Sequence, residues 1–191
     1  MNAEIFVSDE QSVLPMEVDR WARLAHHVLD AEAVPQDSEL SILFVDSDAI
    51  TALNGRFRDM HQPTDVLAFG IDDEDQGLGS GRSPDGGGPG PGWVPPEPSD
   101  VPFLLGDVVI CPEVAAANAV EHGVALEREV ALLVVHGILH LRGHDHEDDE
   151  EAQVMERREQ ELLDRWWVAE AGSDGRPPYR QDGLQDGNGA V

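Results

Sequence analysis

Four of the eight histidines in this chain fall within eleven residues, between His136 and His146. Residues 130–135, just before them, are apolar and hold no helix breaker, which predicts a buried helix leading into a polar site. Residues four positions apart share one face of a helix, so His136 and His140 are expected to point the same way. Gly143 suits the end of that helix, because glycine adopts the left-handed conformation at little cost. The chain can then fold back and bring in His146.

Three histidines with the spacing H-x3-H-x5-H predict a metal site. Three neutral imidazoles with one open coordination position are typical of a catalytic zinc site, since structural sites usually fill the fourth position with protein. The alternative is that these side chains are solvated or hydrogen-bonded histidines, which fits one histidine better than three at this spacing. We expect one zinc ion per chain, bound by His136, His140 and His146. Nickel and copper also bind imidazole strongly, so the pattern leaves the native metal open.

The same spacing matches the longer zinc-protease signature at each ligand and at the glycine. That signature requires glutamate directly after the first histidine, as the general base of peptide hydrolysis. Here the position is occupied by Gly137, which cannot transfer a proton. Either the base comes from elsewhere or the reaction is not proteolysis, so a zinc peptidase is the weaker hypothesis.

The chain is expected to form one domain, residues 1–170, followed by a disordered tail, residues 171–191. Residues 71–101 are rich in glycine, proline and acids, and are predicted to be a disordered insertion within that domain. The single cysteine, Cys111, excludes a disulfide framework and a cysteine-based zinc site. The N-terminal residues do not resemble a signal peptide, and no apolar run approaches the roughly 20 residues that span a membrane. A cytoplasmic protein with no membrane partner is therefore expected.

The charge of the chain is strongly negative, with 39 acids against 12 basic residues, all of them arginine. This balance argues against a broad electrostatic footprint on nucleic acid, and no DNA partner is expected. Screening at physiological salt acts over roughly 8 Å, so a metal ion and one or two arginines can still dominate a cleft.

Alternating strand and helix patterns predict a mixed α/β or α+β fold, in which helices pack on a small mixed sheet. The second helix is expected to start at Asp46 or Ser47 and to place Ile50, Leu53 and Phe57 on its core face. Strands are expected at residues 5–7, 40–45, 64–69 and 105–111, and helices at residues 15–30, 47–58, 112–120 and 125–142, with a last helix after the acidic run 147–151.

Residues 136–146 resemble the signature of the YbeY proteins, bacterial endoribonucleases that act in ribosomal RNA maturation. The residues Phe57-Arg58, the stretch PTDVLAF at 63–69 and the stretch LGDVVIC at 105–111 are similar to that family's other signatures, in the same order. The chain departs from the family pattern where His144 replaces a usual tyrosine, Ala68 a usual serine and Gly70 a usual proline, and in the longer loop before residue 105.

The resemblance implies an architecture related to zinc-dependent hydrolases, with zinc on His136, His140 and His146 and a catalytic role for Arg58. It implies a single-strand-specific, metal-dependent endoribonuclease in late 16S rRNA 3′-end maturation, ribosome biogenesis and quality control. The implied partners are ribosomal RNA, a small ribosomal subunit protein and a ribosome-assembly GTPase. A further hypothesis is a ribosome-assembly binding factor with a structural zinc, because an acidic surface suits basic ribosomal proteins.

A phosphodiester substrate agrees with these residue types. Zinc lowers the pKa of a bound water to about 7 and polarises a phosphoryl oxygen. A planar guanidinium such as that of Arg58 can clamp the non-bridging oxygens, although an exposed arginine at a helix end is the simpler interpretation. His144 and Asp145 are candidates for proton relay or for orienting a ligand imidazole. The attacking group stays open between water and the 2′-hydroxyl of the substrate.

Overall fold

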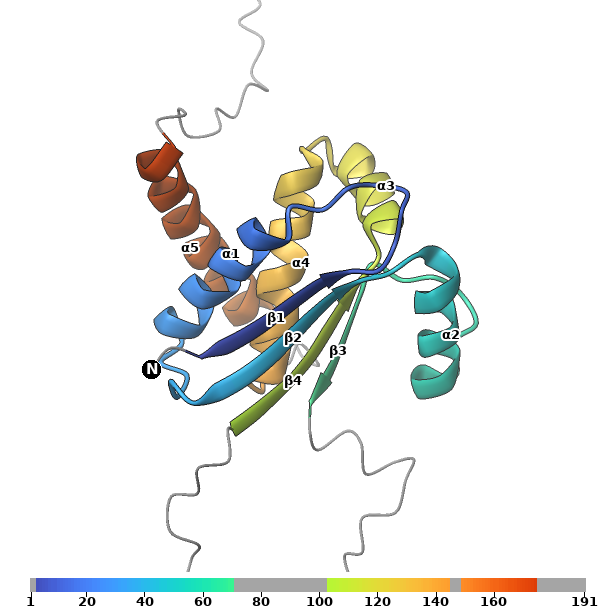
Figure 1. The fold of residues 1–191 in the computed structure, drawn as a ribbon, viewed down its shortest axis with the longest axis horizontal. Helices are drawn as coiled ribbons and strands as arrows, with labels where there is room; N and C mark the ends of the chain where they lie inside the picture. Colours follow the sequence, from blue (N-terminus) through green and yellow to red (C-terminus); the bar gives the residue numbers. More distant parts are fainter. Residues whose placement is uncertain (1–2, 71–102, 145–148, 175–191) are drawn as a thin grey trace, which may run out of the picture.

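The computed structural model describes residues 3–70, 103–144 and 149–174 (Figure 1). Every predicted strand and helix is present among them, with ends shifted by a few residues. In chain order the elements are β1 (Glu4–Asp9), α1 (Val18–Ala31), β2 (Ser38–Phe44), α2 (Ser47–Arg58), β3 (Val66–Gly70), β4 (Phe103–Ile110), α3 (Pro112–His122), α4 (Leu126–Leu141) and α5 (Asp149–Asp174).

The four strands form one sheet in the order β1-β2-β4-β3. β1, β2 and β4 are parallel, and β3 runs antiparallel to β4 at the edge of the sheet. The predicted small mixed sheet is therefore confirmed. Val7, Ile42, Val108 and Ala68 align across the four strands, which places their side chains on one face of the sheet.

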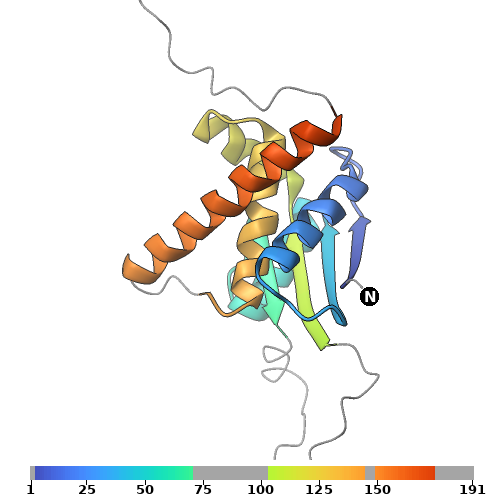
Figure 2. The same cartoon turned by 90° about the vertical axis from the view of Figure 1, so that its left-hand side faces the viewer.

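That face carries the main hydrophobic core. α1 packs over β1, α4 packs over β4 and β3, and α5 packs across α4 and α1 (Figure 2). A Cβ atom at Gly137 would lie 2.5 Å from a methyl group of Val108, so glycine is what lets α4 approach the sheet this closely. The core includes Leu24, Val28, Ile42, Phe44, Val108, Ile110, Val134, Ile138, Leu162 and Trp166.

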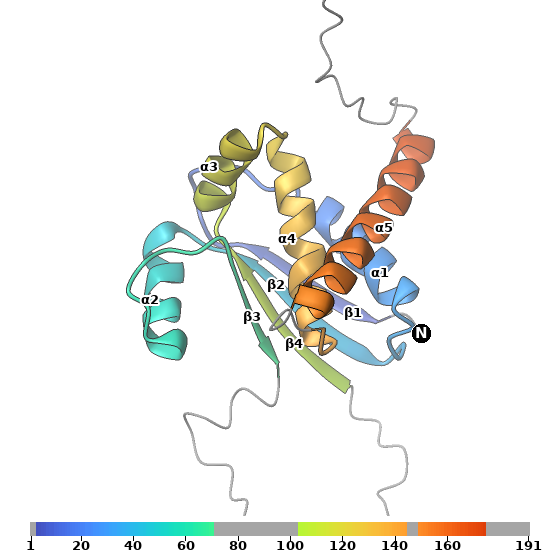
Figure 3. The same cartoon turned by 180° about the vertical axis from the view of Figure 1, so that it is seen from behind.

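The opposite face of the sheet is covered at its β3 edge by α2 (Figure 3). The carboxylate of Asp46 accepts a hydrogen bond from the backbone N–H of Ala49 at 2.8 Å, which identifies Asp46 as the N-cap. Ile50 is buried against Leu67 and Val109, as predicted for the core face.

The prediction that Phe57 also faces the core is wrong, because its side chain is 49% exposed. Phe57 occupies the last turn of α2, where its ring packs at a tilt against Phe69 instead of entering the core. The backbone then turns at Asp59, which adopts the left-handed conformation with φ 55°.

The C-terminal helices differ in how closely they follow the predictions. α4 ends at Leu141, and Gly143 takes a positive φ of 84° in the turn that follows, as expected from its position. α5 continues to Asp174, four residues into the segment predicted as a tail. The predicted insertion at residues 71–101 and the remainder of the predicted tail lie outside the described residues. No helix among the described residues has the length and apolar character that crossing a membrane requires.

Candidate active site

His136 and His140 lie on successive turns of α4, and their rings meet edge to face. Their Nε2 atoms are 3.1 Å apart, and their ring planes are inclined by 77°. Two imidazole nitrogens bound tetrahedrally to one zinc ion at 2.0–2.1 Å are separated by roughly 3.4 Å. The pair therefore has nearly the spacing that a shared ion requires, and its nitrogen donors suit zinc.

The ring of His136 is fixed from its other side by Glu159 of α5. An oxygen of the Glu159 carboxylate lies 2.7 Å from Nδ1 of His136, and the carboxylate is largely buried. An ionised carboxylate can only accept a hydrogen bond, so with Glu159 ionised this contact requires the proton of His136 on Nδ1. In the neutral ring Nε2 then presents a lone pair, which is the form that binds metals. A carboxylate behind a ligand histidine is a common feature of metal sites, and the sequence analysis did not identify Glu159.

The third predicted ligand, His146, and the candidate Asp145 both lie outside the described residues. Within residues 3–70, 103–144 and 149–174, no group of three or more histidine, cysteine or acidic side chains is arranged to hold a metal ion. The structure thus brings together two of the three predicted ligands, and the complete three-histidine site stays a prediction.

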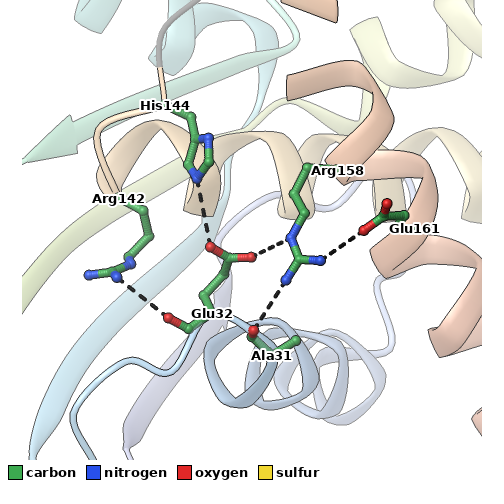
Figure 4. A network of polar contacts seen from close by, with 6 residues as sticks. All are labelled: Ala31, Glu32, Arg142, His144, Arg158 and Glu161. Atoms are coloured by element: carbon green, nitrogen blue, oxygen red, sulfur yellow. Dashed lines mark hydrogen bonds and ion pairs between the residues drawn. The ribbon is translucent and has the colours of Figure 1, made fainter. Parts of the chain in front are cut away.

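The residues that flank 145–148 converge on Glu32 at the end of α1 (Figure 4). On the α4 side, Nε2 of His144 lies 3.7 Å from the Glu32 carboxylate, and Arg142 donates to the Glu32 carbonyl at 3.4 Å. On the α5 side, Nε of Arg158 donates to the same carboxylate at 2.7 Å, which raises the pKa of the Arg158 guanidinium. A second nitrogen of Arg158 donates to the carbonyl of Ala31 at 3.1 Å.

This network joins the residues that follow α4, and one turn of α5, to the end of α1. Arg158 and Glu159 are neighbours on α5, so one turn of that helix contacts both the end of α1 and the ring of His136. His144, a candidate for proton relay or for orienting a ligand, contacts Glu32 in this arrangement, and its chemical role stays a prediction.

Arg58 is the last residue of α2, and its side chain is exposed. Among the described residues, no acid or carbonyl pairs with its guanidinium. α2 and α4 lie on opposite faces of the sheet, but both end toward the same end of it, where the β3 arrow finishes (Figure 3). The structure therefore brings Arg58 to the same end of the sheet as His140 without placing the two in contact.

The stretch between Arg58 and β3 is held by Asp65, from the signature at residues 63–69, and by Asn54 of α2. The carboxylate of Asp65 accepts from the backbone N–H of Val66 at 2.9 Å and from Asn118 at 3.0 Å. Asn54, buried in α2, donates to the carbonyl of Gln62 at 2.8 Å. These bonds give Asp65 and Asn54 a structural explanation, because they fix the path from the end of α2 into β3.

The mixed sheet, with α4 packed on it, defines an α/β protein, and α4 carries a site made of two histidines. A family model described as endoribonuclease YbeY matches residues 6–167. The chain belongs to this family, which confirms the resemblance seen in the sequence.

Individual relatives agree with this assignment. The chain is 39% identical to an endoribonuclease YbeY of Parafrankia sp. (strain EAN1pec) over 165 residues, covering 86% of this chain and 95% of the relative. It is 40% identical to that of Thermobifida fusca, covering 85% and 93%, and 34% identical to that of Geobacillus thermodenitrificans, covering 84% and 94%. The solution structure of TM1509 from Thermotoga maritima matches with a TM-score of 0.54 at 22% identity, over 95% of this chain and 99% of that one, which supports the fold.

Replacement of Glu159 by glutamine is expected to weaken zinc binding roughly 10- to 100-fold, because the ring of His136 loses a charged acceptor that fixes its tautomer and orientation. A competition titration of the purified variant against a zinc chelator measures this. The matched control is Glu129→Gln, since Glu129 is also buried and lies 3.2 Å from a histidine, His122, away from the pair on α4. Equal zinc affinities for wild type and Glu159→Gln would contradict a role for Glu159 in the site.

Proposed function

We propose that this protein is a zinc-dependent endoribonuclease specific for single-stranded RNA, with the ion held by His136, His140 and His146. The observation that carries the proposal is the 3.1 Å approach of the two Nε2 atoms, one on a ring whose Nδ1 is held by Glu159. When bound, zinc supplies a Lewis acid that polarises a phosphoryl oxygen and lowers the pKa of water.

The chain's own residues bind and orient the substrate in this proposal. Arg58, with no acidic partner among the described residues, donates two hydrogen bonds to the non-bridging phosphate oxygens in this proposal. These bonds strengthen as charge develops on the oxygens, so Arg58 lowers the barrier as well as holding the substrate. Glu159 keeps the proton of His136 on Nδ1, and His144 and Asp145 remain the candidates for moving protons.

The biological substrate in this proposal is ribosomal RNA, cleaved late in maturation of the 16S rRNA 3′ end and during ribosome quality control. A small ribosomal subunit protein and a ribosome-assembly GTPase are the proposed partners, in the cytoplasm. The family assignment supports this role, because the matching relatives are named endoribonucleases.

The second candidate is a ribosome-assembly binding factor in which the zinc is structural. It is favoured by the formal net charge of −27, which suits basic ribosomal proteins better than bare RNA. A zinc peptidase is disfavoured by the packing as well as by the sequence. A glutamate at position 137 would place its Cβ 2.5 Å from Val108, so this position cannot hold a general base without moving α4.

The test is cleavage of a single-stranded ribosomal RNA fragment by the purified protein, with metal content determined on the same sample. Removal of the metal by chelation is expected to abolish cleavage, and stoichiometric zinc is expected to restore it. The same RNA annealed into a duplex should remain uncut. Undiminished cleavage by protein proven to be metal-free would contradict the proposal. A metal-loaded protein that binds pre-ribosomal particles but never cuts RNA would favour the binding factor.

A further inference from the structure

The last turn of α2 and the residues after it present an unusual surface, which we call the α2 tip: Arg56, Phe57, Arg58 and Met60. Phe57 is 49% exposed and Met60 is 44% exposed, so two large apolar side chains face solvent beside two arginines. Neither apolar side chain is explained by the core, which α2 contacts through Ile50 and Leu53.

Two neighbouring side chains contact the ring of Phe57. It packs against Phe69 of β3 with ring centroids 4.9 Å apart and planes inclined by 57°. The guanidinium carbon of Arg56 lies 5.1 Å from the centroid of the Phe57 ring. Phe69 therefore fixes the position of the Phe57 ring, and Arg56 places a planar cation next to that ring. Aromatic rings and guanidinium planes are the two groups on which proteins stack unpaired RNA bases.

The charge of the α2 tip points to a polyanion. Among the described residues, neither Arg56 nor Arg58 forms an ion pair. Other arginines do pair with acids, as Arg20 does with Glu170 at 2.6 Å and Arg158 does with Glu32 at 2.7 Å. On a strongly acidic chain, two exposed guanidinium groups that form no ion pair among the described residues provide local phosphate sites.

The α2 tip lies at the same end of the sheet as the imidazole pair, on the opposite face (Figure 3). The backbone of Phe69 and the side chain of Leu141 both lie close to Gly106. A Cβ atom added to Gly106 would clash with the Phe69 carbonyl oxygen and with the Leu141 side chain. Leu141 directly follows His140 at the end of α4. An RNA strand that contacts Phe57 and passes the end of β3 would therefore run toward the imidazole pair.

We propose that the α2 tip is a base-stacking subsite for single-stranded RNA, in which Phe57 and Arg56 stack one base and Arg58 binds the adjacent phosphate. This inference rests on the proposed function for its substrate class. It goes further in assigning Phe57 and Arg56 to recognition of an unpaired base, which excludes duplex RNA because paired bases are already stacked on their neighbours. Stacking uses the ring face that every base has, so this subsite tolerates any sequence.

The test is binding in the presence of a chelator, so that no cleavage occurs, to a short single-stranded RNA containing the fluorescent base 2-aminopurine. Phe57→Ala is expected to bind roughly 5- to 100-fold more weakly than wild type, the range for losing one base–aromatic stack. Phe57→Leu keeps an apolar contact with Phe69 but has no ring, and should lose affinity similarly. Phe57→Trp should bind at least as well as wild type and quench the 2-aminopurine.

Phe6 provides the matched control. It is 52% exposed and aligns through Ser41 and Asp107 with Phe69, so it lies on the same face of the sheet but at the opposite edge, on β1. Phe6→Ala should bind RNA as wild type does. Wild-type RNA affinity in both Phe57→Ala and Phe57→Leu would overturn the proposal and would favour a protein partner for the α2 tip. An absence of RNA binding by the wild-type protein would also overturn it.

The outcomes separate this subsite from the proposed activity. Protein that binds RNA through Phe57 but does not cleave it when loaded with zinc keeps the subsite and refutes the nuclease. Protein that cleaves RNA with unchanged affinity after Phe57→Ala keeps the nuclease and refutes the subsite.

Discussion

Replacement of His136 by alanine is expected to abolish RNA cleavage and to release zinc from the protein. The substitution removes one of two imidazole nitrogens that lie 3.1 Å apart, so the remaining histidines cannot hold the ion in the same geometry. Loss of even one electrostatic contact to a transition state slows catalysis by about 10²- to 10³-fold, and loss of the metal removes more than one. RNA cleavage and zinc content, measured on the same sample, provide the readout.

The variant should remain folded. Glu159 loses its 2.7 Å partner, and leaving a buried polar group unpaired costs about 1–3 kcal/mol, less than the usual stability of a domain. His122→Ala is the matched control, because it also removes a histidine that pairs with a buried carboxylate, Glu129, but at the junction of α3 and α4. Its cleavage and zinc content should equal those of wild type. A folded, zinc-free His136→Ala protein that cleaves at the wild-type rate would refute the metal-dependent mechanism.

The position of the two α4 histidines could be predicted because it depends on local geometry alone. Helical periodicity places residues 136 and 140 on one face, and the surrounding apolar stripe orients that face relative to the core. Local backbone preference likewise located the end of α4, because glycine tolerates the positive φ of 84° that Gly143 adopts. These features need no information about which other element packs nearby.

Glu159 could not be assigned in the same way, since its partner His136 is 23 residues distant and lies on another helix. α5 is rich in acids, and most of them are exposed. A signal was nevertheless present, because Met155, Glu159, Leu162 and Trp166 follow one helical stripe and the other three are core residues. A carboxylate between core residues of such a stripe must find a buried partner, so Glu159 called for an explanation.

The exposure of Phe57 illustrates the opposite limitation. Its spacing from Ile50 and Leu53 fits a core face, and the pattern alone cannot tell that its ring stays half exposed against Phe69 of β3. Only the pairing of β3 with β4 fixes how far the covered surface extends, and that pairing joins strands separated by a long stretch of chain. The error is informative, because a predicted core residue found at the surface marks a place where packing does not account for the sequence.

Replacement of Arg58 by glutamate is expected to reduce RNA cleavage by at least about 100-fold while zinc content stays at the wild-type level. The guanidinium is exposed at the end of α2 and lies on a different element from the histidine pair, so its loss should leave the metal site intact. The cost arises because the charge that develops on the phosphate oxygens loses a cation and meets an anion instead. Cleavage rates at saturating RNA, beside zinc content and thermal unfolding, separate this effect from misfolding.

Arg23→Glu controls for the change in net charge, because Arg23 is exposed on α1, which packs over β1 at the sheet edge opposite β3. It should cleave RNA at the wild-type rate. If Arg58→Glu retained full activity at saturating RNA, Arg58 would be an ordinary helix-end arginine and the phosphate clamp would have to come from another residue. If both arginine variants lost activity equally, the loss would reflect the overall charge of an already acidic protein, and the acidic surface rather than a single clamp would govern its encounter with RNA.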